Sequence, residues 1–449
     1  MTVNETIDQQ MLKTRYEPLP DYSNLVTDDF RVHRSLFTDS KIFEDEMLKI
    51  FGGTWVYLLH ESEIPEPFDF ETRTVGRRPV IISRGEDREI TAIFNRCSHR
   101  GTLLCPLESG SARRFQCAYH GWTFANTGRL IGITYPDGYR TSFDREAYNL
   151  GRMPRVESYR GFVFGSLNPD VEPLLDWLGN TRSMIDWVLN RAGESDIRVV
   201  KASTMEYRGN WKLQNDNNGD MYHTPFTHRS TLAMTTERHG AGKSLDHFKG
   251  DKSDMKVRNF GNGHKMIDQR PSIDSIWERA RPIPGKEVYA DQLRERIGET
   301  RALEYLELVG RSGINLVLYP NLVIDGGDGG IVWRVYEPVS VNLTRIHSYI
   351  AIIVDAPPEV NTLRMRFAED FVNIGNRDDL EIFERIQEAL ASLPELEWID
   401  VSRGYDTSRE YLENDGSLSG AVSDETGIRG GYMRWVELMS STLTTGVVL

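Results

Sequence analysis

Four residues in the first third of the chain could together bind a metal centre: Cys97, His99, Cys117 and His120. They form two short motifs, Cys-x-His and Cys-x-x-His, so each motif offers one thiolate and one imidazole. A glycine follows each histidine closely and allows the backbone to turn its N–H groups toward bound sulfur. Two loops of this kind can hold one centre between them.

Two kinds of centre fit these ligands. Two cysteines and two histidines can hold zinc tetrahedrally, but zinc fingers pair cysteine with cysteine and histidine with histidine at short spacing. The mixed motifs favour a [2Fe–2S] cluster in which one iron takes both thiolates and the other both imidazoles, which raises its potential above that of plant-type ferredoxins. Such a cluster relays single electrons. The third cysteine, Cys105, has no partner at motif spacing and is predicted to be a buried structural thiol.

A second candidate site lies in residues 215–228, which read N-D-N-N-G-D-M-Y-H-T-P-F-T-H. His223 and His228 would diverge by about 140° on a regular helix, so both can face one metal only if the helix distorts or ends between them. Pro225 is placed for such a break. Two imidazoles and one carboxylate form the facial triad of non-haem Fe(II) oxygenases. A histidine pair alone would suggest a core or surface role, but an electron relay upstream requires a redox partner.

The carboxylate of this triad must come from elsewhere in the chain. We predict Asp379, in the first turn of a late helix, with Asp378 as the alternative. An acidic residue there also has a structural explanation, because the helix dipole stabilises carboxylates at N-termini. Asp220 lies one helical turn before His223 and can accept the ring N–H of that histidine, which would orient it.

The helices and strands predicted around these residues indicate an α+β protein. Short runs rich in Val, Ile, Phe and Tyr, separated by turn residues, indicate a β-rich domain over residues 46–168. It follows an N-terminal segment, 1–45, expected to pack on the second domain, 169–449. An amphipathic helix is predicted at Lys41–Phe51, and a helix at Pro173–Ala192 begins the second domain.

The second domain is predicted to be an antiparallel sheet surrounded by helices. A Gly-rich segment, 326–330, indicates a hairpin, and Asn376 is placed to cap the late helix. Residues 239–281 lack clear periodicity and predict a long loop or lid. The predicted strands are Asn315–Ile324, Ile331–Tyr336 and His347–Val354, and the predicted helices are Lys286–Leu308 and Arg377–Leu390.

The composition excludes several classes of protein. The 449 residues are 39% hydrophobic and 27% charged, as in ordinary globular proteins. A net charge of −14 argues against a general nucleic-acid binder. The longest apolar runs fall far below the roughly 20 residues of a membrane-spanning helix. Residues 1–17 have no signal-peptide pattern and three cysteines are too few for a disulfide framework, so we expect a cytoplasmic protein that does not cross a membrane.

With both motifs in place, the chain resembles the large (alpha) subunit of Rieske non-haem iron aromatic-ring-hydroxylating dioxygenases, most strongly the benzoate, toluate and anthranilate type. The resemblance covers nearly the whole chain. One mild departure is Asp216, where relatives often carry Glu or Asn. The matching segments are Trp55-Val56-Tyr57, His60-Glu61-Ser62-Glu63-Ile64-Pro65, Cys97-Ser98-His99-Arg100-Gly101, Cys117-Ala118-Tyr119-His120-Gly121-Trp122, Tyr159-Arg160-Gly161-Phe162-Val163-Phe164-Gly165, Asn210-Trp211-Lys212 and Asp220-x-Tyr222-His223.

The resemblance implies a Rieske domain followed by a catalytic non-haem iron domain. In the family the two centres of one subunit are too far apart for efficient electron transfer. Asp220 would therefore bridge to His120 of a neighbouring subunit, in a ring of three alpha subunits with or without beta subunits. The implied cluster ligands are Cys97, His99, Cys117 and His120, and the implied iron ligands are His223, His228 and Asp379.

The implied reaction adds both atoms of O₂ to an aromatic ring and gives a cis-dihydrodiol. Electrons would come from NADH through a separate reductase or ferredoxin, because the chain has no Gly-rich dinucleotide fingerprint. The family favours an aromatic carboxylate, which needs a cationic or hydrogen-bonding anchor that the sequence does not identify. The alternatives are a monooxygenase or demethylase with the same centres, a zinc-stabilised binding module, and an electron carrier, which the length and the second histidine pair disfavour.

Overall fold

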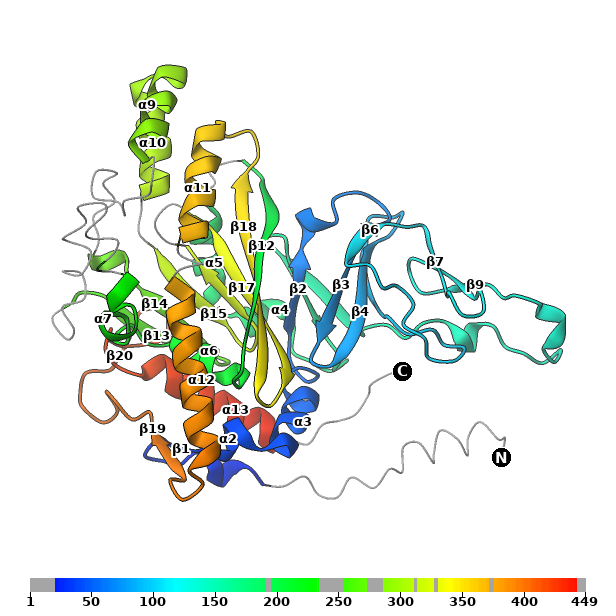
Figure 1. Cartoon of the computed structure of the whole chain (residues 1–449), viewed down its shortest axis with the longest axis horizontal. Helices are drawn as coiled ribbons and strands as arrows, with labels where there is room; N and C mark the ends of the chain where they lie inside the picture. Colours follow the sequence, from blue (N-terminus) through cyan, green and yellow to red (C-terminus); the bar gives the residue numbers. More distant parts are fainter. Residues whose placement is uncertain are drawn as a thin grey trace.

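The computed structural model describes residues 21–190, 195–231, 233, 253–272, 286–310, 313–326, 330–370 and 375–441. Its largest element is a nine-stranded sheet in the order β12-β18-β17-β16-β15-β14-β13-β21-β20 (Figure 1). Every neighbouring pair in it is antiparallel, as predicted. The strands are β12 (Ile197–Tyr207), β13 (Lys256–Gly261), β14 (His264–Asp268), β15 (Ile314–Leu318), β16 (Leu322–Asp325), β17 (Val332–Ser340), β18 (Leu343–Ile353), β20 (Tyr411–Leu412) and β21 (Leu418–Ala421).

The β-rich part that precedes this sheet consists of three small sheets, in the orders β5-β4-β3-β6, β7-β8-β9 and β10-β11-β2. A two-residue turn joins β3 to β4, and Gly76 provides the positive φ of 59° that such hairpin turns require. The strands are β2 (Val56–His60), β3 (Asp69–Val75), β4 (Arg78–Arg84), β5 (Ile90–Phe94), β6 (Ser109–Ser111), β7 (Arg114–Gln116), β8 (Thr123–Ala125), β9 (Leu130–Gly132), β10 (Arg155–Tyr159) and β11 (Phe162–Ser166).

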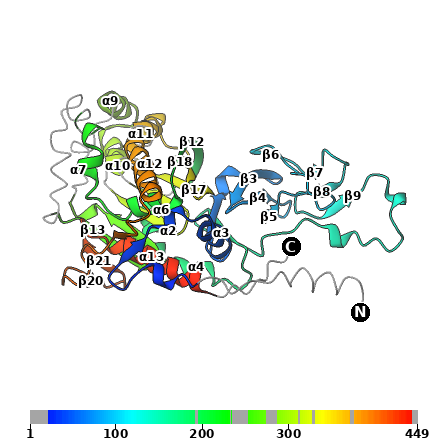
Figure 2. The ribbon, with the colours of Figure 1, turned by 60° about the horizontal axis from the view of Figure 1, so that its bottom comes forward.

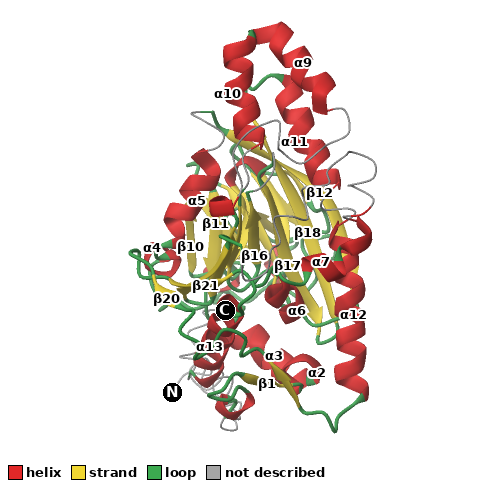
Figure 3. Ribbon diagram, turned by 90° about the vertical axis from the view of Figure 1, so that its left-hand side faces the viewer, coloured by secondary structure: helices red, strands yellow, loops and turns green. Residues whose placement is uncertain are grey.

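Helices surround the large sheet, as Figure 3 shows. α6, α11, α12 and α13 pack against its strands. None of the helices in the described ranges has the length and apolarity needed to span a membrane. The helices are α2 (Ser35–Thr38), α3 (Ser40–Lys49), α4 (Leu174–Leu178), α5 (Thr181–Leu189), α6 (Trp211–Asn217), α7 (Thr224–Thr227), α9 (Lys286–Ile297), α10 (Glu299–Gly310), α11 (Pro358–Asp370), α12 (Asn376–Ser392) and α13 (Thr426–Ser440). A short pair, β1 (Arg31–His33) and β19 (Trp398–Asp400), joins the N-terminal segment to a late loop.

The two faces of the large sheet have different neighbours. Successive residues of a strand point to opposite faces. On β17, Tyr336 points toward α6, where the side chain of Asn218 donates to its hydroxyl. Trp333 points the other way and packs on the β-rich part, with its ring 5.0 Å from that of Phe162 and 5.7 Å from that of His60. The β-rich part, together with α4 and α5, therefore lies on one side of β17, and α6 lies on the other.

The helix predicted at Lys41–Phe51 is present as α3, and it buries a charged residue against the helical layer. Glu46 is fully buried and accepts hydrogen bonds from Lys212 (2.6 Å), Trp211 (2.9 Å) and Trp435 (2.7 Å). Three donors and one opposite charge compensate the burial of this carboxylate. This cluster ties α3 to α6 and α13.

Four predictions for the second domain were wrong in detail. The helix predicted at Pro173–Ala192 is two helices, α4 and α5, which are separated at Gly179 and Asn180. Residues 256–268, predicted as part of a loop or lid, form the paired strands β13 and β14, whereas 239–252 and 273–281 lie outside the described residues. Asn315–Ile324 is a hairpin of two strands, and Lys286–Leu308 is two helices separated at Gly298, whose φ is +82°. The Gly-Asn-Gly turn at 261–263 was the overlooked signal for the first hairpin.

Candidate active site and metal centres

Three side chains predicted to bind iron meet in space. The nitrogens of His223 and His228 and a carboxylate oxygen of Asp379 all lie within 4.8 Å of one another. His228 Nε2 is 3.2 Å from Asp379 Oδ1, and His223 Nε2 is 3.8 Å from the same oxygen. Asp379 is buried, and the two histidines are partly buried. A partly buried group of two imidazoles and one carboxylate is suited to a divalent transition metal with open coordination positions.

The helix between the two histidines explains their convergence. His223 directly precedes the single turn of α7, and His228 directly follows it. Pro225 lies in the first turn of this helix, where proline is tolerated because its missing N–H has no intrahelical partner. The helix does end between the histidines, as predicted, but the placement of the break at Pro225 was wrong. The helix is instead so short that both histidines are its flanking residues.

Each histidine is oriented by a neighbouring carboxylate. Asp220 Oδ1 lies 2.9 Å from His223 Nδ1 and also accepts the backbone N–H of His223 at 3.1 Å. Asp378 Oδ2 lies 3.4 Å from His228 Nδ1 and accepts the Thr231 hydroxyl at 2.7 Å. These contacts leave the Nε2 atoms of both rings directed at Asp379. Asp378, the alternative ligand, lies behind His228 and outside the three-residue group.

Asn217 is a residue at this site that the sequence did not single out. Its side-chain amide nitrogen lies 3.2 Å from His223 Nε2 and donates to Asp379 Oδ1 at 3.2 Å. It thus touches two of the three potential ligands. The only signal in the sequence was its place in the polar run at 215–218, which did not distinguish it from its neighbours.

The four Cys and His residues of the β-rich part lie on two similar loops. Cys97 N–H donates to the Thr102 carbonyl, and Cys117 N–H donates to the Trp122 carbonyl, both at 2.8 Å. The rings of His99 and His120 are 4.7 Å apart. The two loops therefore place their imidazoles side by side.

The two thiols differ in pKa, because burial raises the pKa of Cys97 whereas the pKa of Cys117 is lowered. Burial alone would raise the pKa of the Cys117 thiol, but the N–H groups of Tyr119 and His120 and a contact with Cys97 lower it. Both cysteines are buried and free of disulfides. His120 Nδ1 is buried with no hydrogen-bond partner, as expected for a nitrogen whose partner is a metal.

The spacing of these four residues fits a cluster better than a single ion. Ligands of one tetrahedral zinc ion lie roughly 3.3 to 3.8 Å apart, as bond lengths of about 2.0 to 2.3 Å require. In the described part of the chain, His223, His228 and Asp379 are the only group of three or more potential ligands within 4.8 Å of one another. Cys97, His99, Cys117 and His120 are more widely spread, so they fit two bridged irons rather than zinc.

Comparisons with known proteins agree with both sites. Residues 54–149 match the Rieske [2Fe-2S] domain, and residues 195–441 match the catalytic domain of the ring hydroxylating alpha subunit. The chain belongs to the ring-hydroxylating alpha-subunit family. Membership implies a Rieske cluster, a mononuclear iron and a separate electron donor, and it confirms the predicted enzyme class.

Individual relatives of this alpha subunit support the resemblance seen in its motifs. It is 36% identical to the alpha subunit of toluate 1,2-dioxygenase from Pseudomonas putida, over 93% of this chain and 94% of the relative. It is 33% identical to the large subunit of anthranilate 1,2-dioxygenase from Acinetobacter baylyi, over 84% and 80%. A solved naphthalene 1,2-dioxygenase with indole in its active site superposes with a TM-score of 0.77 at 26% identity, covering 95% of this chain and 97% of that one.

Proposed function

We propose that this alpha subunit is the terminal oxygenase of a dioxygenase that adds both atoms of O₂ to an aromatic carboxylate and gives a cis-dihydrodiol. The observation that carries the proposal is the convergence of His223, His228 and Asp379 in a chain that also has the paired Cys-His loops. Relatives named for toluate and anthranilate, both aromatic acids, support the substrate class.

We assign the potential ligands as follows. Cys97, His99, Cys117 and His120 hold the [2Fe–2S] cluster, and His223, His228 and Asp379 hold the mononuclear iron. When bound, the cluster supplies single electrons and the iron supplies the positions at which O₂ and the ring are brought together. Asp220 and Asp378 keep both imidazoles in the tautomer that presents Nε2 to the metal. We further propose two domains, a Rieske domain at residues 46–168 and a catalytic domain at residues 169–449. Residues 1–45 would pack on the catalytic domain.

We also propose that a complete electron path requires a second copy of the chain. The Cys-His loops, next to β7, and the iron triad, next to α7, lie at opposite ends of the molecule in Figures 1 and 2. Asp220 touches His223 and is partly exposed, so it can reach His120 of a neighbouring subunit. A ring of three alpha subunits, with or without beta subunits, would bring these two groups together. Three free cysteines fit a reducing, cytoplasmic location.

The test is product analysis with ¹⁸O₂, a reductase, NADH and benzoate as the first aromatic carboxylate. A cis-dihydrodiol with two labelled oxygen atoms is expected. A hydroxybenzoate with a single labelled oxygen would instead assign a monooxygenase reaction to the same site. Conversion of a methoxybenzoate to an unlabelled hydroxybenzoate, with release of labelled formaldehyde, would assign a demethylase reaction. Iron and acid-labile sulfide analysis with EPR of the reduced protein is the accompanying control, since a colourless, zinc-loaded protein would refute both metal assignments.

A further inference from the structure

A buried arginine lies on the sheet face that carries the candidate active site. Arg334 on β17 is 3% exposed and points to the same side as Tyr336, toward α6 and α12. Its direct neighbour on β18 is Ser348, and the neighbour of Ser348 on β12 is Ser203. Directly paired residues in antiparallel strands share a face. One guanidinium and two hydroxyls therefore form a row across three strands of this face.

The guanidinium is held by two neutral amides. Arg334 donates to Asn218 Oδ1 at 2.9 Å and to Asn376 Oδ1 at 3.1 Å. Within the described parts of the chain it forms no ion pair with a carboxylate. Asn376 was predicted to cap α12, but Gly375 holds the cap position and the Asn376 side chain binds Arg334 instead. The guanidinium has five N–H donors, so two hydrogen bonds do not satisfy it.

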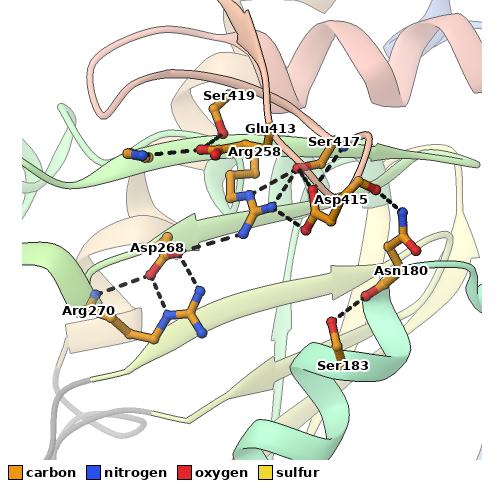
Figure 4. A network of polar contacts seen from close by, with 10 residues as sticks. Asn180, Ser183, Arg258, Asp268, Arg270, Glu413, Asp415, Ser417 and Ser419 are labelled. Carbon is orange, nitrogen blue, oxygen red and sulfur yellow. Dashed lines mark hydrogen bonds and ion pairs between the residues drawn. The ribbon is translucent and has the colours of Figure 1, made fainter.

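Another arginine of the same sheet shows what a buried guanidinium ordinarily requires. Arg258 on β13 is buried to a similar degree, and Figure 4 shows it between two carboxylates. It lies 2.5 Å from Asp415 and 3.9 Å from Asp268, and Ser417 accepts two further hydrogen bonds from it. A buried charge is costly unless it is paired in this way. Arg334 lacks the counter-charge that Arg258 has.

Further polar atoms beside Arg334 also lack partners. The hydroxyl of Ser348 and the amide nitrogen of Asn376 are buried without a hydrogen-bond partner, and both residues are at most 3% exposed. A hydroxyl and an amide N–H₂ can each donate. Together with the free N–H groups of Arg334 they form a set of donors with a positive charge, which is the chemistry that binds a carboxylate.

This donor set adjoins the iron triad through the segments that carry Asn218 and Asn376. Asn376 lies one helical turn before Asp379 on α12. Asn218 follows Asn217, whose amide touches His223 and Asp379. An aromatic acid bound to Arg334 would therefore lie close to the triad.

We propose that Arg334 binds the carboxylate of the aromatic substrate, with the Ser348 hydroxyl and the Asn376 amide as additional donors. This assignment rests on the proposed function and specifies the anchor that an acidic substrate requires. Asn218 and Asn376 are positioning residues that fix the plane of the guanidinium, so it meets the carboxylate with two parallel hydrogen bonds. A purely structural role would be served better by an apolar residue, because replacing buried charges with packed apolar groups is often stabilising.

The experiment compares benzoate with nitrobenzene, its neutral isostere, in Arg334→Met, Arg334→Lys and wild-type enzyme. Removing one partner of a buried charge pair should raise the KM and the Kd for benzoate at least about 30-fold in Arg334→Met. Nitrobenzene oxidation by Arg334→Met should be unchanged or improved. The KM and Kd of Arg334→Lys for benzoate should lie between those of the wild type and Arg334→Met. Arg345→Met, which removes a guanidinium from the opposite face of the same sheet, is the matched control and should not alter the preference.

Calorimetric binding of benzoate gives a readout independent of turnover. An unchanged preference for benzoate over nitrobenzene in folded Arg334→Met would overturn the anchor while leaving the proposed function intact. Failure of the wild type to oxidise any aromatic carboxylate would overturn the proposed function itself. If Arg334→Met does not fold, Ser348→Ala, which removes one buried oxygen, should weaken benzoate binding about 10-fold and leave nitrobenzene unaffected. Equal effects on both compounds would refute the proposal.

Discussion

Substitution of Asp220 by Asn separates two roles that this residue could have. Asp220 accepts two hydrogen bonds from His223, one from the ring at 2.9 Å and one from the backbone at 3.1 Å. Asn keeps the shape and one accepting oxygen but removes the negative charge. If Asp220 links the iron site to a neighbouring subunit, Asp220→Asn should retain its cluster and iron and lose turnover.

The expected effect on iron binding can be bounded from these contacts. A hydrogen bond to a charged group contributes about 1.5 to 3 kcal/mol, and loss of a residue that orients a metal ligand typically lowers metal affinity about 10- to 100-fold. Asn still accepts the ring N–H, so the loss of iron affinity in Asp220→Asn should be near about 10-fold. Reconstitution with excess Fe(II) should then fill the site. Loss of turnover in the iron-loaded variant could not be attributed to a missing metal.

Asp378→Asn is the matched control, because Asp378 contacts His228 much as Asp220 contacts His223. Its contact is longer, 3.4 Å, so activity should fall at most about 10-fold. The assay is a single turnover, in which the chemically reduced enzyme is mixed with O₂ and substrate and cluster reoxidation is followed by absorbance. Reoxidation of Asp220→Asn at the wild-type rate would remove Asp220 from the electron path. Equal losses in both variants would leave only a ligand-orienting role.

Three further predictions concern stability and the third cysteine. Glu46→Gln leaves the buried Lys212 ammonium without its counter-charge and should lower the free energy of unfolding by about 3 to 5 kcal/mol, measured by urea denaturation. Burial lowers the pKa of His264 from 6.5 to about 3, so between these values the unfolded chain binds one more proton than the native one and stability falls as the pH falls. His264→Gln should therefore reduce the slope of unfolding free energy against pH by about 1.4 kcal/mol per pH unit between about pH 4.5 and 6. An unchanged slope would show that His264 is not the group whose burial causes this pH dependence. Cys105→Ser should leave the cluster EPR signal and turnover near wild type, and loss of the signal would give this thiol a role at the cluster.

Local sequence predicted the parts of the site that depend on nearby residues. The Cys-His loops and the pair His223 and His228 lie within short segments, so their spacing alone indicates the chemistry. Asp379 is distant in sequence, and a carboxylate in a first helical turn has an equally good structural explanation. Its selection required the family resemblance.

The rest of the site depends on strand register, which the sequence does not display. The strands β13 and β14 were missed, because their polar and apolar residues do not alternate cleanly and β14 is buried throughout. Arg334 adjoins Ser348 only because β17 and β18 pair in one particular register. A shift by one residue would turn this arginine to the opposite face. No pattern within β17 distinguishes such an arginine from one that is ion-paired on the surface.

The placement of Arg334 also bears on which ring carbons would react. Its two amide partners come from the two segments that supply the triad, Asn218 from the end of α6 and Asn376 from the first turn of α12. The segment after α6 and the start of α12 also lead to His223 and carry Asp379, so the anchor and the triad are linked through Asn217, Asn218 and Asn376. A carboxylate held there by two hydrogen bonds would fix the ring relative to the triad, and orientation of this kind lowers the barrier to reaction. The same contact would then determine both which substrates bind, namely acids, and which edge of the ring faces the triad. This double role would account for a buried arginine without a counter-charge at this position.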